Sequence, residues 1–444
     1  MINDLPPELA AQIFDLLTFD PSQFGSANHR EVIVTLATVC RYWHEVLLAH
    51  PQFWSKRRLR VTSRLRNEPD PLVPRLVAHL KRWFEHAGDL PRNLSVTFET
   101  TPRETKTLYN YLIQEHRWKA LEFVLDVGQA TNWTWLEQLM RGAAKWKGRN
   151  DGHHCWPSLQ SLTIRAEGAT FIESKSSLHP PLQSIAPNLR GFLLEVGRLD
   201  DPQYTVLASV PWESLRHFEF NGTLSDETHP HWHFHVPDLT KARNLESLTI
   251  HYRYAYQSSY IIQAPPFPNL VTHRNLVRLA LRAHFTSIYP FLGSVVLPSL
   301  RSLDLYSTVF STGDRAQTPM ADSLRQLVSR SQCQIKTLRL YCLPGHPEDL
   351  HDSLEVLPTL ESIDLRSPPF TLARHDQGHW DRFVFKVFQE DASRSDVLCT
   401  NLKSFTYKTR EHLLVADSSN EDFALFRRDP LEWYKVEVAR RTGT

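Results

Sequence analysis

The chain has 444 residues, of which 50 are lysine or arginine and 49 are aspartate or glutamate. This length suffices for two or more domains or for one long array of repeats. The near balance of charge gives no reason to expect nucleic acid or an anionic membrane as a partner. No apolar run approaches the roughly 18 residues of a membrane span, and the start, Met-Ile-Asn-Asp, lacks the basic and then apolar order of a signal peptide.

Two amphipathic helices are predicted near the N-terminus. The first carries an apolar stripe with helical spacing, made of Leu9, Ile13, Leu16 and Leu17. Phe14 lies off this stripe, and Leu5 and Pro6 precede it, so the helix has apolar groups to spare. The second pattern is Val32, Leu36, Val39, Trp43 and Leu47, and Phe53 and Trp54 close the segment. So short a segment buries too little surface to stand alone, so it is expected to pack on the rest of the chain or on another protein.

The letters "LPPELAAQIFDLL … VCRYWHEVLLAHPQFW" resemble the F-box motif, with its three blocks in order. The resemblance implies a helical segment over 1–56 that docks on a Skp-type adaptor and, through it, on a cullin and a RING subunit. The positions that match the motif's core and adaptor face are Leu5, Pro6, Leu9, Ile13, Phe14, Val39, Cys40 and Trp43. The gap between the first two blocks is about ten residues longer than is usual in the family, as in the large fungal F-box families. The alternative is an ordinary helical cap on a repeat domain.

A phrase of the form LxxLxL recurs from Leu159 onward. Its first positions are Leu159, Leu189, Leu215, Leu245, Leu276, Leu300, Ile335, Leu360 and Leu402, with spacings from 24 to 42 residues. This is the leucine-rich repeat pattern in an irregular form, and weaker copies continue upstream. Helical patterns lie between the copies, one of them ending near Gly88. The predicted fold class is α/β: an all-α F-box segment, a leucine-rich-repeat-like solenoid with a curved parallel sheet over 57–420, and a cap or tail over 421–444.

The usual asparagine after the LxL letters is missing from these repeats. Side-chain ladders are therefore not expected to satisfy the turns as they do in regular members of the class. We expect uneven curvature and long loops.

Target binding is predicted on the strand face that points away from the helices. Side chains at positions 3, 5 and 7 of each repeat face that surface, which would be concave, because positions 1, 4 and 6 face the core. In the later repeats the candidate residues are Arg278, Arg282, Asp304, Tyr306, Arg339, Tyr341, Asp364 and Arg366. Arginine and tyrosine often anchor interfaces, and the arginines suit an acidic or phosphorylated segment. The alternative is that the loops bind the target.

Few residues suggest chemistry. His229, His231, His233 and His235 share one face if they form a strand, and His153, His154 and Cys155 form a smaller group. One straight strand cannot wrap a metal ion, so we expect no metal and no cofactor. In the basic stretch Lys56–Arg66, apolar and basic residues alternate, which predicts a half-buried strand rather than a nuclear signal or a nucleic-acid contact. No GxSxG, P-loop, GxGxxG or HExxH motif occurs, so the chain is not expected to be an enzyme.

These patterns lead to one functional hypothesis and two rivals. The chain is predicted to be the substrate-recognition subunit of an SCF-type ubiquitin ligase, with a protein substrate and no nucleic-acid or membrane partner. The rivals are a non-catalytic leucine-rich scaffold whose F-box acts outside a ligase, and a metal-dependent enzyme that uses the histidine row. The five cysteines form no CxxC pair and are odd in number, which indicates reduced thiols in the cytoplasm and/or the nucleus.

Overall fold

The structure is a computed structural model, and the chain forms two compact units, Met1–Leu215 and Arg216–Thr444. The residues that it describes are 5–18, 29–61, 72–98, 106–125, 131–149, 153–170, 182–199, 210–224, 241–254, 271–283, 285–307, 320–341, 347–366, 399–408 and 413–417. Predictions that fall on other residues, including the histidine row and the tail over 421–444, lie outside this part of the chain.

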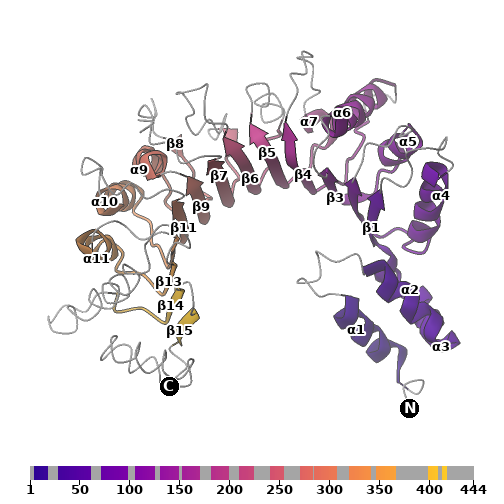
Figure 1. Cartoon of the computed structure of the whole chain (residues 1–444), viewed down its shortest axis with the longest axis horizontal. Helices are drawn as coiled ribbons and strands as arrows, with labels where there is room; N and C mark the ends of the chain where they lie inside the picture. Colours follow the sequence, from indigo (N-terminus) through magenta and orange to yellow (C-terminus); the bar gives the residue numbers. More distant parts are fainter. Residues whose placement is uncertain are drawn as a thin grey trace. The chain divides into compact units, whose positions relative to one another are not determined.

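The first unit begins with helices and continues as alternating strands and helices (Figure 1). Its helical start is α1 (Pro7–Thr18), α2 (His29–Val39), α3 (Arg41–Ala49) and the 3₁₀ turn η3 (Pro51–Trp54). Its later helices are α4 (Leu72–Glu85), α5 (Lys106–Gln114), α6 (Thr131–Arg149) and α7 (Leu182–Ile185). Its strands are β1 (Lys56–Val61), β2 (Arg92–Phe98), β3 (Trp118–Leu125), β4 (Ser161–Thr170) and β5 (Gly191–Leu199).

These five strands pair in parallel and in chain order, β1 through β5. Helices α4, α5 and α6 lie along one face of the strands, as Figure 1 shows. Parallel neighbours joined by a helical crossover on one face are the pattern of stacked strand–helix units. Helix α4 ends where the sequence predicts, since Gly88 adopts a φ of 57° and its N–H donates to the Glu85 carbonyl oxygen at 3.1 Å.

The second unit repeats the arrangement. Its strands are β6 (His217–Leu224), β7 (Ser247–Tyr254), β9 (Arg278–Ala283), β11 (Ser302–Ser307), β12 (Thr337–Tyr341), β13 (Ser362–Arg366), β14 (Ser404–Lys408) and β15 (Leu413–Asp417). They pair in that order, parallel except for the last pair. Short strands β8 (Val271–Thr272) and β10 (Val295–Val296) pair separately. The helices are α9 (Phe285–Ser294), α10 (Met320–Ser331) and α11 (Pro347–Glu355).

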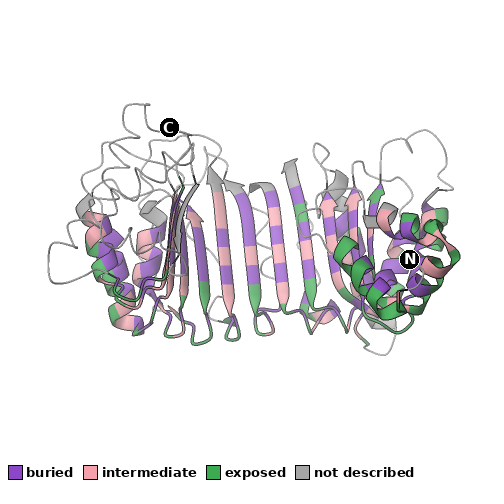
Figure 2. Ribbon diagram, turned by 90° about the horizontal axis from the view of Figure 1, so that it is seen from below, coloured by how far each residue is buried: buried purple, intermediate pink, exposed green. Residues whose placement is uncertain are grey.

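Burial alternates along the strands, as Figure 2 shows by the purple and pink bands. In β12, for example, Leu338 and Leu340 are buried, whereas Thr337, Arg339 and Tyr341 are half-buried. This is the period of two expected from the LxxLxL frame. The protein is thus a mixed α/β structure with N-terminal helices and a large parallel sheet, consistent with a repeat solenoid. None of the described helices is both long and apolar enough to cross a membrane.

The side chains that support the turns lie at the entrance to the strands. Asn188, Asn275 and Asn401 each precede the first leucine of a repeat, and each side-chain amide donates to a backbone carbonyl oxygen of the preceding repeat, at 2.8, 2.9 and 3.1 Å. Ser214 and Thr359 do the same through their hydroxyls, at 2.8 and 2.9 Å. In these repeats the side-chain support therefore comes before the first leucine, and the expectation about the turns after the LxL letters stays a prediction.

Candidate protein-interaction site

Phe14 forms the centre of the N-terminal helical segment. Its ring is buried and lies 5.0 Å from the ring of Trp43 and 6.3 Å from that of Phe53, measured between centroids. Other buried residues come from α2 and α3: Ile33, Leu36, Val46 and Leu47. Phe14 thus belongs to the core of this segment, together with the buried Ala10 and Ala11.

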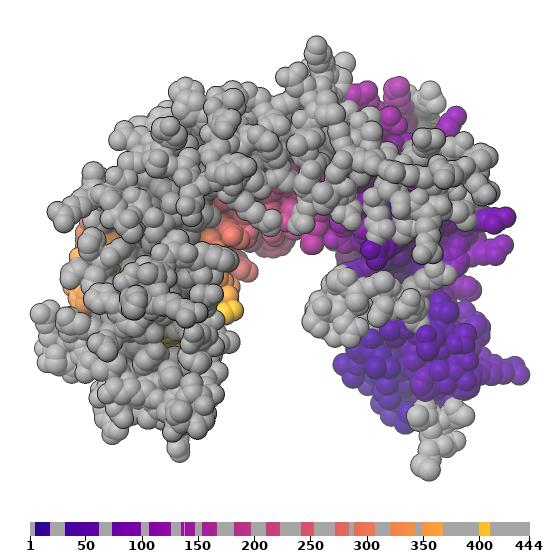
Figure 3. All heavy atoms as spheres, viewed as in Figure 1, coloured from indigo at the N-terminus to yellow at the C-terminus, as the bar shows by residue number. Residues whose placement is uncertain are grey.

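The stripe predicted on α1 faces solvent instead. Leu9, Ile13, Leu16 and Leu17 are 45, 43, 78 and 51% exposed. We name these four residues the α1 face; α1 belongs to the indigo, N-terminal end of the chain in Figure 3. The sequence therefore predicted the helix and its stripe correctly, but the assignment of Phe14 to the surplus apolar groups is wrong, because Phe14 is buried in the core while the stripe is exposed. Periodicity does not show which face of a helix meets a partner.

Other positions that match the motif take mixed roles. Val39, at the end of α2, is exposed, whereas Leu5, Cys40 and Trp43 are half-buried. The Leu5 carbonyl oxygen accepts a hydrogen bond from the Tyr42 hydroxyl, and the exposed Pro6 supplies a carbonyl oxygen for the Leu9 N–H at 3.0 Å. Cys40 caps α3, with its Sγ 3.5 Å from the Trp43 N–H.

A cluster of aromatic and cationic groups joins this segment to the first strand–helix unit. The Trp54 indole donates to the Leu47 carbonyl oxygen at 2.8 Å and lies edge-on to Trp83 of α4, with centroids 4.7 Å apart. The guanidinium of Arg57 lies 4.1 Å from the centroid of the same Trp83 ring and 3.1 Å from the imidazole of His79, measured from Nη2 to Nε2. Leu59 and Val61 are buried and Arg58 and Arg60 face outward, as the strand interpretation of the basic stretch predicts; the burial of Arg57 is the feature that the alternation did not predict.

A cavity of about 360 Å³ lies where this segment meets the strands. Its wall combines Asp15 of α1 and Phe53 of η3 with side chains from β1 through β4. Charged and hydroxyl groups both line it, among them Arg58, Glu122 and Thr163. The lining thus mixes charged and hydroxyl groups with a larger share of apolar surface.

Seven of the eight candidate target-binding residues form two rows on the strand face of the second unit, as the strand register shows, and Arg278 lies outside both rows, beside Ser302. In one row, Asp304 lies between Ala280 and Arg339, and Asp364 follows Arg339. In the other, the order is Arg282, Tyr306, Tyr341, Arg366 and Lys408. The sequence placed all eight predicted residues on this face, and the structure brings them side by side.

A further charged group lies at the start of these strands. Glu361 accepts hydrogen bonds from the ammonium groups of Lys336 at 2.6 Å and Lys403 at 2.8 Å. Lys336 and Lys403, in that order, lower the pKa of the Glu361 carboxyl from 4.5 to about 2. At this edge of the sheet, the ammonium groups of two lysines therefore share one carboxylate.

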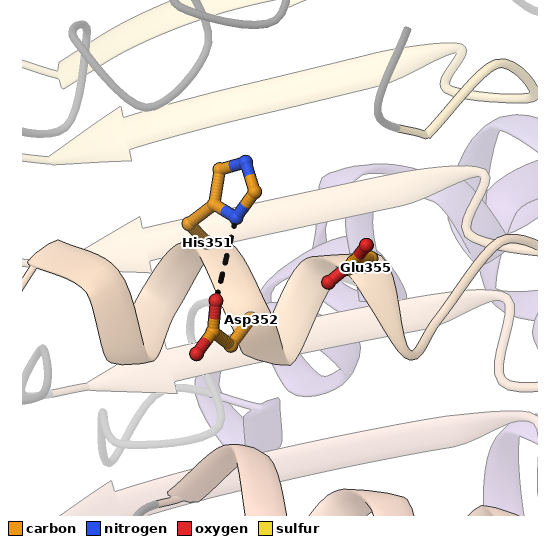
Figure 4. A group of neighbouring side chains, drawn as sticks. All are labelled: His351, Asp352 and Glu355. Atoms are coloured by element: carbon orange, nitrogen blue, oxygen red, sulfur yellow. Dashed lines mark ion pairs between the residues drawn. The ribbon is translucent and has the colours of Figure 1, made fainter. Parts of the chain in front are cut away.

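Two residues of the smaller group that suggested metal chemistry, His154 and Cys155, are engaged elsewhere. His154 lies 2.9 Å from the Ser184 carbonyl oxygen through Nδ1, and the Cys155 thiol donates to the Ile113 carbonyl oxygen at 3.3 Å. Burial raises the pKa of the Cys155 thiol to about 12, so it is a poor ligand at neutral pH. A group that the sequence did not single out, His351, Asp352 and Glu355 on α11, has ligand atoms within 4.8 Å of one another (Figure 4). Exposed groups of this kind are common without an ion, and the absence of a metal stays a prediction.

Comparison with known families gives one match. The F-box-like family model matches residues 2–60, the segment that contains α1, α2, α3, η3 and most of β1. No curated protein matches the chain. F-box domains are typically non-catalytic adaptors that bind Skp-type proteins. The chain therefore carries an F-box-like domain at residues 2–60.

Proposed function

We propose that this chain is the substrate-recognition subunit of an SCF-type ubiquitin ligase. Its F-box-like domain binds a Skp-type adaptor and, through it, a cullin and a RING subunit. Its strand–helix units, over 57–420, are irregular leucine-rich repeats like those of fungal F-box proteins, and they bind a target protein in the cytoplasm and/or the nucleus. The chain itself contributes proximity, which raises the effective concentration of target lysines beside the thioester carried elsewhere.

The observation that carries this proposal is the α1 face. Exposed apolar residues at helical spacing are typical of a helix that meets a partner, and here they belong to the segment that matches the F-box-like family. Val34, Val39 and Leu48 add exposed apolar groups on α2 and α3. Phe14, Ile33 and Leu47 meanwhile fill the domain's own core, so the α1 face is not needed to fold it.

The link to the repeats supports the second half of the proposal. Trp54 is bonded to Leu47 of α3 and packed on Trp83 of α4, so the domain and the first strand–helix unit share buried groups. A subunit that presents a target benefits from such a fixed junction, because a flexible one lowers the effective concentration.

Copurification of the adaptor and the cullin tests this function. The variant Ile13→Glu with Leu16→Glu places two charges on the α1 face, where each interface anchor is worth about 2 kcal/mol or more. We expect the double variant to lose the Skp-type adaptor and the cullin while its thermal unfolding is unchanged. The matched control is Leu90→Glu with Val277→Glu, which adds the same charges at two other exposed apolar residues.

Each result of this experiment distinguishes between the proposed function and its alternatives. Undiminished copurification with the Ile13 and Leu16 variant would show that the α1 face is not the adaptor site. An adaptor that copurifies with the unaltered chain without any cullin would support the scaffold alternative. A loss of the adaptor in the control variant would mean that added charge, rather than its position, disrupts binding.

A further inference from the structure

The row at the carboxyl ends of β9, β11, β12 and β13 is a continuous stack of planar groups. The guanidinium carbon of Arg282 lies 4.0 Å from the centroid of the Tyr306 ring. The rings of Tyr306 and Tyr341 lie 5.3 Å apart, at 35° to each other, and the guanidinium carbon of Arg366 lies 4.6 Å from the Tyr341 centroid. Two arginines therefore bracket two tyrosines across four strands; we call Arg282, Tyr306, Tyr341 and Arg366 the stacked row.

The neighbouring row decides which cations are available to a partner. The carboxylate of Asp304 is buried and holds two guanidinium groups, those of Arg278 at 2.9 Å and Arg339 at 3.5 Å. These two arginines are therefore partly neutralised within the fold. Arg282 makes no ion pair with any carboxylate in the described part of the chain, and its Nε is buried without a hydrogen-bond partner there.

The other end of the stacked row also has hydrogen-bond donors that a partner could use. Arg366 uses Nε and Nη2 on Asp364, the shortest of these hydrogen bonds being 2.8 Å, which leaves its Nη1. Lys408 of β14, exposed, stands beside Arg366 in the register. Counting both rows with Arg278 and Lys408, five cations face two carboxylates, whereas the whole chain has a formal charge of only +1. This face therefore suits an acidic partner.

The spacing of the stacked row specifies the partner further. Arg282 and Arg366 are three strand intervals apart, about 14 Å at about 4.8 Å per interval. An extended peptide that crosses the strands covers about 13 Å between residues i and i+4, at about 3.3 Å per residue, and its side chains at i, i+2 and i+4 share one face. The i+2 side chain then falls between Tyr306 and Tyr341.

We propose that the stacked row binds an extended acidic segment of the target, with carboxylate side chains at i and i+4 and an aromatic or large apolar side chain at i+2. The carboxylate at one end pairs with Arg282, and the one at the other end pairs with Arg366 and Lys408. The central side chain lies on Tyr306 and Tyr341. This inference rests on the proposed function, in which the strand face of the second unit holds the target.

Direct binding of short peptides to the full chain tests the inference without an adaptor. The probe is a labelled peptide with the core Glu-Ser-Phe-Thr-Glu, and fluorescence anisotropy reports its affinity. We expect a core with glutamine for both glutamates to bind at least about tenfold more weakly, since charge-assisted hydrogen bonds are lost. A core with its glutamates at i and i+2 should also bind more weakly, since one carboxylate then misses its partner.

Variants of the chain locate the site. Arg282→Gln should weaken the acidic probe about tenfold, and Arg282→Lys, which keeps the charge but loses the planar group on Tyr306, should weaken it less. Arg301→Gln is the matched control, because Arg301 is an exposed arginine at the start of β11, outside both rows. Equal weakening by the Arg282 and Arg301 variants would overturn the site.

Two further results would also overturn the inference. One is equal affinity for the glutamate and glutamine cores in the unaltered chain, a test that does not depend on how any variant folds. The other is binding only when phosphoserine replaces both glutamates, which would assign the row to phosphate instead. If the peptide does not bind but the adaptor still copurifies, this inference alone is refuted. If the adaptor does not copurify, the proposed function is refuted, whatever the peptide does.

Discussion

The indole of Trp54 meets the indole of Trp83 edge-on, with the ring centroids 4.7 Å apart. Trp54 closes the F-box-like domain, and Trp83 lies on α4 of the first strand–helix unit, so this contact joins the two. Trp83 also donates its indole N–H to the Lys56 carbonyl oxygen at 3.2 Å, on the strand between them. The two indoles at the junction are thus held both by their contact with each other and by their hydrogen bonds to backbone carbonyl oxygens.

Trp54→Ala should loosen this junction. It removes the contact with Trp83 and the hydrogen bond to the Leu47 carbonyl oxygen, and truncation of a buried tryptophan costs about 3–5 kcal/mol. We expect limited proteolysis to cut the variant between residues 50 and 60, where the native protein resists. Rapid cleavage of the native protein at the same place would show that the junction is not rigid.

Trp43→Ala is a matched comparison. The motif predicts a core role for Trp43, and the structure shows a half-buried ring in contact with Phe14. Its truncation should therefore cost less than that of Trp54 and leave the 50–60 segment resistant. A larger loss of stability from Trp43→Ala than from Trp54→Ala would contradict this order.

The close contact of α5 and α6 gives a second prediction. A Cβ added at Gly142 of α6 would lie 2.8 Å from Cδ1 of the buried Ile113 of α5. Gly142→Ala should gain up to about 1 kcal/mol of helix propensity, offset by the shift of the Ile113 Cδ1 methyl group that the added Cβ requires, so the unfolding temperature should change little. Ile113→Val removes that methyl group, so Gly142→Ala should raise the unfolding temperature more in that background. Simple additivity of the two changes in a double-mutant cycle would show that the contact is not tight.

The repeat frame shows how far periodicity can carry a prediction. The LxxLxL letters placed Leu338, Leu340 and their counterparts in the core and put Arg339 and Tyr341 on the strand face that points away from the helices, and the burial of these residues agrees. The sequence could not show that Asp304 holds Arg278 and Arg339, because that depends on the register of three strands far apart in the chain. Ion pairs of this kind can be identified only from the three-dimensional structure.

The N-terminal domain shows where periodicity fails. Leu9 and Ile13 share a stripe with Leu16, yet it is Phe14, off the stripe, that fills the core. Hydrophobic spacing identifies a helix but does not tell a core face from a partner face when a helix has both. The buried Arg57 was missed for a related reason, since its charge is accommodated by the Trp83 ring and His79, residues of a helix that the strand's own alternation does not involve.

The acidity of Glu361 gives a prediction on pH. The folded pKa of about 2 lies below the usual 4.5, first because of Lys336 and then because of Lys403. A group with a lowered folded pKa stabilises the protein above its unfolded pKa, and the contribution is lost as the pH falls from about 4.5 toward about 2. Lys336→Met and Lys403→Met should each raise the Glu361 pKa, measured by NMR titration of its carboxyl carbon. Lys408→Met, at the far end of β14, should not change it; an equal rise there would point to general charge rather than to these hydrogen bonds.

Asp304 holds the cations of the strand face in place, and its removal should alter recognition. Asp304→Asn keeps the size of the side chain but releases the guanidinium groups of Arg278 and Arg339 from a shared carboxylate. Those groups are 50 and 39% exposed, so the loss of stability should be small, about 1 kcal/mol after screening by solvent. The freed charges should make the acidic probe bind more tightly. They should also reduce the preference for a peptide with glutamates at i and i+4 over one with glutamates at i and i+2, because cations are then available at more positions.

Asp322→Asn is the control, since it breaks an exposed ion pair with Arg325 on α10 and should leave both affinities unchanged. Weaker binding of both probes by the Asp304 variant, with an intact melting curve, would mean that Asp304 itself contacts the target and that the partner of this face is not purely acidic.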